Sequence, residues 1–218
     1  MAPFACSVWA AAVLATTSVA GAPDRVPPPR VASASDDAFT DSERGAVVAW
    51  AMARSEVRAA NAGHRTRLLR VWSDAVKDPE GAYRRATLIV RDYDAGTARE
   101  ITVDLSKGRV RIRDLPGAPP SREEIEEGMA IVRADRALAP FVQNPRLSLV
   151  GGFHNRSPYP DDPCGREICL EYGLMKPDYE GPARYVIVNL TRRVVAHHDF
   201  RARPGEPPPR MTEPAPTR

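Results

Sequence analysis

The sequence predicts an α+β protein made of two units in tandem, each with one helix packed on an antiparallel sheet. Short segments in both halves alternate apolar and polar residues with the two-residue period of a strand. Each half also holds one helix-capping sequence. The last hairpin of the first half aligns without a gap on the last hairpin of the second, which indicates a weak internal repeat.

The chain begins with twenty residues that carry no charged side chain and include an apolar run over 8–15. We interpret residues 1–20 as an export signal, because the run is too short for a permanent membrane span and small residues precede Gly21. A disordered or buried N-terminus is the alternative. Residues 21–38 are rich in Pro and Ser and are expected to form an extended linker. Residues 201–218 contain six prolines and are expected to be a disordered tail.

The first unit is expected over residues 39–117. Thr40 begins a capping box with Glu43, and the helix that follows is expected to end at Gly63. With a two-residue loop in the last hairpin, Asp104 opposes Arg109 and Glu100 opposes Arg113, and each pair stabilises the sheet by about 0.2–1 kcal/mol. The strands of this unit are predicted over 67–72, 83–92, 100–105 and 109–113.

Three arginines, Arg109, Arg111 and Arg113, share one face of the last of these strands. One interpretation is a solvated face whose arginines pair with acidic residues on the neighbouring strand. The other is an anion-binding surface for nucleic acid or a cell-wall polymer. The carboxylates opposite Arg109 and Arg113 and a net charge of only +3 favour the solvated face, so no nucleic-acid partner is expected.

The second unit is expected over residues 118–200. Ser121 can cap a helix with Glu124, and the acidic residues of the first turn are explained by capping and the helix dipole. An apolar stripe of Ile125, Met129 and Val132 predicts that this helix packs on a sheet. The strands of this unit are expected over 147–150, 168–174, 183–190 and 193–200.

Two cysteines follow the leader, Cys164 and Cys169. In an oxidising compartment their spacing favours a structural disulfide that closes a short loop and stabilises the fold by about 2 kcal/mol. A redox-active pair or a metal site are the alternatives, but the first favours a shorter spacing and the second needs further ligands. With the leader, the disulfide predicts an extracytoplasmic protein, either periplasmic or secreted.

The chain has four histidines that could bind a metal. The repeat places His197 at the partly buried position of Ile112 and His198 at the exposed position of Arg113. Adjacent strand residues point to opposite faces, so these two histidines cannot both bind one ion. A composite site of His154, His198 and Asp161 is a weaker hypothesis. No catalytic, cofactor-binding or metal-binding residue is predicted, because none of the motifs for nucleophilic or phosphate chemistry is present.

The hairpin that begins with Ile101-Thr102-Val103-Asp104-Leu105 and the capped helix that ends in Ile131-Val132-Arg133-Ala134-Asp135 carry a family resemblance. This part of the chain resembles the second of the small N-terminal domains of copper-containing amine oxidases. Residues 147–200 are similar, less closely, to the third. The resemblance covers roughly residues 38–200 and implies two cystatin-like domains, which in that family accompany a large catalytic domain.

The catalytic domain of that family needs a tyrosine preceded by asparagine, the quinone precursor, and copper-binding histidines that include a His-x-His pair. No tyrosine of this chain follows an asparagine, and the only close histidines are adjacent. The resemblance therefore implies the accessory part of an amine oxidase without its catalytic part.

We predict an exported, non-catalytic binding module with a protein or small-molecule partner, no cofactor and no membrane contact once the signal is removed. Three alternatives stay open: a copper-handling factor, an accessory part or fragment of an amine oxidase, and a peptidase-inhibitor-like protein. The Gln-x-Val-x-Gly loop of cystatin inhibitors is absent, which weakens the last.

Overall fold

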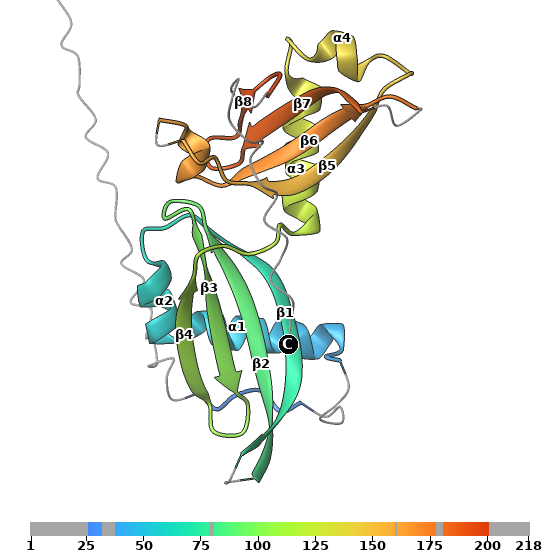
Figure 1. Cartoon of the computed structure of the whole chain (residues 1–218). Helices are drawn as coiled ribbons and strands as arrows, with labels where there is room; N and C mark the ends of the chain where they lie inside the picture. The colour runs from blue at the N-terminus through green and yellow to red at the C-terminus, as the bar shows by residue number, and fades with distance from the viewer. Residues whose placement is uncertain (1–25, 32–37, 79–80, 160, 178–180, 201–218) are drawn as a thin grey trace, which may run out of the picture.

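The computed structural model describes the chain in five segments. It contains two four-stranded antiparallel sheets, with strand orders β1-β2-β3-β4 and β5-β6-β7-β8, and a helix packs on one face of each (Figure 1). The α+β fold of two tandem units is thereby confirmed. The expected export signal, most of the linker and the C-terminal tail lie outside the described residues, which are 26–31, 38–78, 81–159, 161–177 and 181–200.

Thr40 caps the first helix through the expected reciprocal bonds with Glu43. The helix does not continue to Gly63, because Arg54 takes an extended conformation and its backbone N–H turns back to the Ala51 carbonyl. A second short helix then turns Val57 into the core. The elements of this unit are α1 (Asp41–Ala53), α2 (Ser55–Asn61), β1 (Thr66–Asp78), β2 (Gly81–Asp92), β3 (Thr97–Asp104) and β4 (Arg109–Leu115).

Strand β1 is longer than the alternation of the sequence predicts, because its second half pairs with β2 through polar residues. The Arg84 guanidinium donates to the Ser73 hydroxyl at 3.0 Å, and Arg85 forms an ion pair with Asp74 at 3.1 Å. These side chains contribute no apolar period, so the sequence pattern stops before the strand does.

The β3–β4 hairpin has the predicted register. Asp104 opposes Arg109, and Glu100 opposes Arg113 with an ion pair of 3.1 Å. The loop has four residues and not the expected two: the Gly108 N–H donates to the Asp104 carbonyl at 2.8 Å, and Gly108 has a φ of +65°, which favours glycine.

The second unit repeats this arrangement. Val103 pairs with Val110 in the first sheet, and the aligned Val188 pairs with Val195 in the second, so the internal repeat is structural. A bulge after Ile187 then shifts the register by one residue. The elements of this unit are α3 (Arg122–Ala134), α4 (Ala139–Val142), β5 (Ser148–Asn155), the 3₁₀ turn η2 (Pro163–Gly165), β6 (Cys169–Met175), β7 (Pro182–Asn189) and β8 (Val194–His197).

Each unit has its own core, formed between its helix and one face of its sheet. In the second unit α3 approaches the sheet closely, and the Tyr172 hydroxyl donates to the Ile125 carbonyl at 3.0 Å. The core of the first unit contains Val47, Trp50, Ala51, Leu88, Val90, Ile101 and Val103. That of the second contains Val132, Leu138, Leu170, Tyr172, Leu174, Val186, Val188 and Leu190.

A polar junction joins the two units. The guanidinium of Arg91, at the end of β2, is fully buried and lies 3.1 Å from the Glu124 carboxylate in the first turn of α3. The Tyr93 hydroxyl donates to the same carboxylate at 2.8 Å. Arg65 donates to the carbonyls of Leu190 and Thr191 at 3.1 and 2.8 Å. Glu124 therefore caps α3, as expected, and also binds the first unit, which capping alone does not predict.

No helix in the described part of the chain is both long and apolar enough to cross a membrane.

Candidate functional site

The predicted disulfide is present, with the Cα atoms of Cys164 and Cys169 5.5 Å apart. The loop that it closes folds over the face of the second sheet opposite α3. There both cysteines pack with Ile187 at the sheet surface, and Phe200 covers them from the side. The loop thus provides a small second core for a face that no helix covers.

The rest of that face is open. Val150, Phe153 and Tyr185 are exposed to 44%, 56% and 43%, respectively. Val150 and Tyr185 lie in one row across the sheet, on either side of Gly173, and Phe153 lies in the next row. We call these three residues the open face. Large apolar side chains that are exposed in neighbouring rows of one sheet face, beside a buried cluster, indicate a surface that binds another molecule.

Val150 and Phe153 of the open face lie in β5, which is an edge strand of the sheet. Two glycines with positive φ, Gly151 and Gly152, form a bulge in this strand. A Cβ atom on Gly152 would lie 2.6 Å from the Ile125 side chain of α3, so glycine is required for the close packing. Because a bulge interrupts the ladder of an edge strand, the side chains of the open face are a better binding surface than the β5 backbone.

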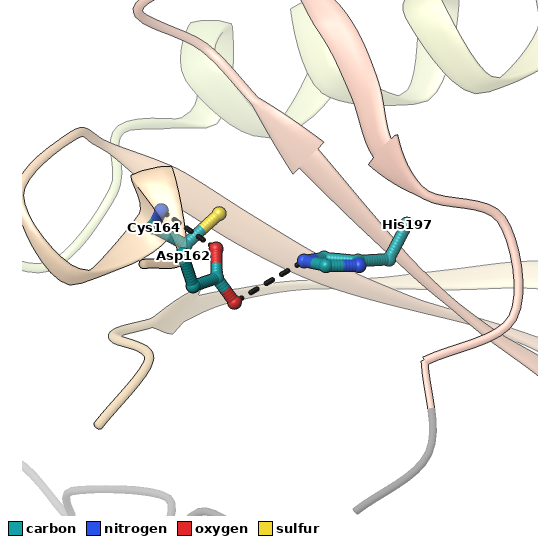
Figure 2. Close-up of side chains that lie close together, drawn as sticks. All are labelled: Asp162, Cys164 and His197. Atoms are coloured by element: carbon teal, nitrogen blue, oxygen red, sulfur yellow. Dashed lines mark hydrogen bonds and ion pairs between the residues drawn. The ribbon is translucent and has the colours of Figure 1, made fainter. Parts of the chain in front are cut away.

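One group of potential metal ligands lies next to the disulfide loop. Figure 2 shows the Asp162 carboxylate between the backbone N–H of Cys164, which donates to it at 2.9 Å, and the His197 ring, whose Nε2 lies 3.2 Å away. The Cys164 sulfur is bonded to Cys169, so it offers no thiolate. The Asp162–His197 contact attaches the disulfide loop to β8, and this accounts for the cluster as a structural element.

A second group of potential ligands comprises His64, Asp92 and Asp94. Asp92 is fully buried, and its carboxylate lies 2.8 Å from His64 Nδ1 and 2.7 Å from the Arg99 guanidinium. Burial raises the pKa of Asp92, but hydrogen bonding to a backbone N–H and to His64, with the Arg99 charge, outweighs burial and holds the pKa below its usual range. The guanidinium therefore already supplies the positive charge that a metal ion would bring.

The hypothetical site of His154, His198 and Asp161 is not among the ligand groups that the described residues form. His198 is exposed, as the repeat predicts, and its Nε2 lies 3.1 Å from the carboxylate of Asp135 at the end of α3. His154 lies near the polar junction: burial, helped by the charges of Arg91 and Arg156, lowers its pKa. The two histidines thus lie in different surroundings.

The cysteine spacing predicts the disulfide, whereas no pattern in the sequence predicts the open face. Val150 ends the strand that the sequence predicts over 147–150, and Phe153 lies beyond that strand. Only the register of β5 on β6, which the glycine bulge sets, shows which of these side chains point away from α3.

No known family model matches this chain, and no curated protein matches it in sequence. Among solved structures, the chain is similar to a copper-containing benzylamine oxidase from Hansenula polymorpha, with a TM-score of 0.51 and 13% sequence identity. The similarity covers 83% of this chain and 32% of the oxidase, so the chain spans about a third of that protein's length. At this identity the similarity shows the fold. It supports the expected resemblance to a region of an amine oxidase, without identifying a particular domain of it.

Proposed function

We propose that the protein is an exported, non-catalytic binding module of two cystatin-like units, and that its open face binds a protein partner. The observation that carries the proposal is the open face itself. Val150, Phe153 and Tyr185 keep between 43% and 56% of their surface exposed on a face where the disulfide loop covers the neighbouring residues. Burying large aromatic side chains is a major source of affinity at protein interfaces.

Three further observations support a role without catalysis. In one group of potential metal ligands, Cys164 is already bonded to Cys169, and in the other the Arg99 guanidinium already forms an ion pair with Asp92. Within these 218 residues no tyrosine follows an asparagine and no His-x-His pair occurs. The structural similarity extends over only 32% of the oxidase. Export is supported by the uncharged leader and by the disulfide, which persists in oxidising compartments.

The fold similarity favours one other candidate, an accessory part of an amine oxidase. In that case the partner that covers the open face is a catalytic chain. The two candidates share the same binding surface and differ in the identity of the partner.

The experiment is a pull-down from the native exported fraction with the wild-type chain, the F153S/Y185S variant and the W72S variant. Trp72 is an exposed aromatic residue of the first sheet and serves as the matched control. We expect one partner to be retained by the wild type and by W72S and lost by F153S/Y185S. Retention by all three chains would overturn the assignment of the open face.

Elemental analysis of the same purified protein tests the non-catalytic part of the proposal. We expect copper and zinc well below one ion per chain. A stoichiometric metal that is lost in a H197A or H198A variant would favour the copper-handling alternative.

A further inference from the structure

A proline-rich segment of the chain, residues 26–31, lies in a groove of the first unit. The Trp50 indole N–H in α1 donates to the Val26 carbonyl at 2.9 Å. Pro28 packs beside the β3–β4 loop, where a Cβ atom on Gly108 would lie 3.3 Å from the proline ring and 3.6 Å from the Trp50 ring. A cavity of about 420 Å³ continues along the segment past Arg84, Leu105 and Ser106. This segment of the expected linker is therefore packed on the domain.

These contacts have the features of polyproline recognition. A run of prolines has no backbone N–H groups to donate, so its carbonyls must be read by donors on the receptor. An aromatic residue that donates a hydrogen bond and also packs against proline rings is the typical solution. Here Trp50 supplies the donor, its ring and Pro28 both lie beside Gly108, and Val31 packs on the core cluster that contains Trp50. The sequence VPPPRV supplies the ligand.

The chain contains a second segment of this kind, residues 206–211, with the sequence EPPPRM. The two segments share Pro-Pro-Pro-Arg and end in an apolar residue. The first position differs, with Val26 in one segment and Glu206 in the other. The Val26 side chain is 56% exposed, and the residue bonds Trp50 through its backbone carbonyl, which any residue has. Pro28, Pro29 and Val31 are partly buried, and 206–211 offers equivalent residues at each of these positions. The groove therefore contacts the residues that the two segments have in common.

The tail of the same copy is too short to deliver this second segment. Phe200 is held on the second unit, where its N–H donates to the Tyr185 carbonyl. The six residues from there to Glu206 span about 21 Å when fully extended. The groove lies at the Asp104 end of β3. The second unit contacts the chain at the opposite end of this strand, at Gly96 in the turn that precedes Thr97. Strand β3 alone is about 27 Å long.

We propose that residues 206–211 of one copy bind the Trp50 groove of a second copy, in exchange for the resident segment 26–31. The resident segment is tethered beside the groove and therefore competes at a high effective concentration. Exchange between copies then increases with protein concentration and with any change that weakens the resident segment. This inference is independent of the open face and its partner.

A peptide titration tests the groove. The titration uses a W72F variant of the full chain, in which Trp50 is the only tryptophan outside the leader. A synthetic peptide of residues 204–213 is titrated against this chain and against the same chain with P28S/P29S. We expect the peptide to shift Trp50 fluorescence and to bind the P28S/P29S chain about tenfold more tightly, a gain of about 1.4 kcal/mol. A control peptide with serine at 207–209 should not bind.

Sedimentation velocity tests the exchange between copies. We expect P28S/P29S to self-associate more strongly than the wild type, and we expect P208S/P209S added in the tail to restore the monomer. Near-UV circular dichroism verifies that each chain is folded. If P28S/P29S does not fold, an excess of each peptide is titrated against the W72F chain with its natural resident segment, and the difference in binding between the two peptides tests the proposal. The proposal would be overturned if the 204–213 peptide and its serine control bound equally well. It would also be overturned if P208S/P209S left the self-association of P28S/P29S unchanged.

Discussion

Arg91 and Glu124 form an ion pair across the junction of the two units, and neither side chain has any exposed surface. The Arg91 guanidinium contacts both carboxylate oxygens, at 3.1 and 3.2 Å, and also donates to the Ala118 carbonyl at 2.9 Å. The Tyr93 hydroxyl completes the environment of the carboxylate. Because these groups come from both units, the junction couples the stability of one unit to the position of the other.

Glu124→Gln should destabilise the fold strongly. The substitution leaves a buried guanidinium without its counter-charge, and breaking a buried pair in this way costs about 3–5 kcal/mol. The free energy of unfolding from urea denaturation measures this loss. Glu126→Gln is the matched control, because Glu126 lies in the same helix with an exposed partner, Arg122, and no measurable change is expected there. A loss for E124Q no greater than that for E126Q would contradict the role of the junction.

The sequence predicts the fold better than the junction, and Arg91 shows why. Arg91 lies near the end of the strand predicted over 83–92, on the face opposite Leu88 and Val90, and the alternation does not predict that its charge is buried. Glu124 fits a capping box and needs no further explanation. The pair exists because α3 of the second unit meets the end of β2, and that contact is tertiary. Local patterns, by contrast, are sufficient for the hairpin register and for both helix caps.

Removing the disulfide should loosen the cover beside the open face. The C164S/C169S variant loses the restriction of a short loop in the unfolded chain, which corresponds to about 2 kcal/mol. We expect a lower urea midpoint and increased binding of a hydrophobic dye, because Ile187 and Phe200 lose part of their cover. Unchanged dye binding would mean that the Asp162–His197 contact holds the loop without the disulfide.

Two helical glycines should respond in opposite directions to replacement by alanine. A Cβ atom on Gly128 of α3 would lie within 3 Å of the Tyr172 ring, so G128A should destabilise the protein by about 1–3 kcal/mol, as overpacking usually does. Gly45 of α1 has open space around it, and G45A should stabilise the protein by about 1 kcal/mol through helix propensity. Thermal unfolding of both variants separates close packing from propensity, and stabilisation by G128A would contradict the close approach of α3 to β6.

Side-chain direction limits what the sequence says about the open face. Gly151 and Gly152 look like a loop in the sequence, yet they form a bulge inside β5. A shift of one residue there decides whether Phe153 faces the core or the solvent. The cysteine pair is different, because compartment chemistry and spacing are local properties of the sequence.

His154 should make the protein less stable in mild acid. Burial, with the positive charges of Arg91 and Arg156, lowers the pKa of His154, and the Glu124 charge opposes this only in part. The unfolded chain titrates near the usual value of about 6.5, so below that pH it binds a proton that the folded state resists. This contribution to stability is therefore fully present above about pH 6.5 and is lost as the pH falls below it. Urea unfolding of the wild type and of H154Q between about pH 7 and pH 5 measures the difference: the wild type should lose more stability over this range than H154Q, and parallel pH profiles would show that His154 is protonated equally in both states.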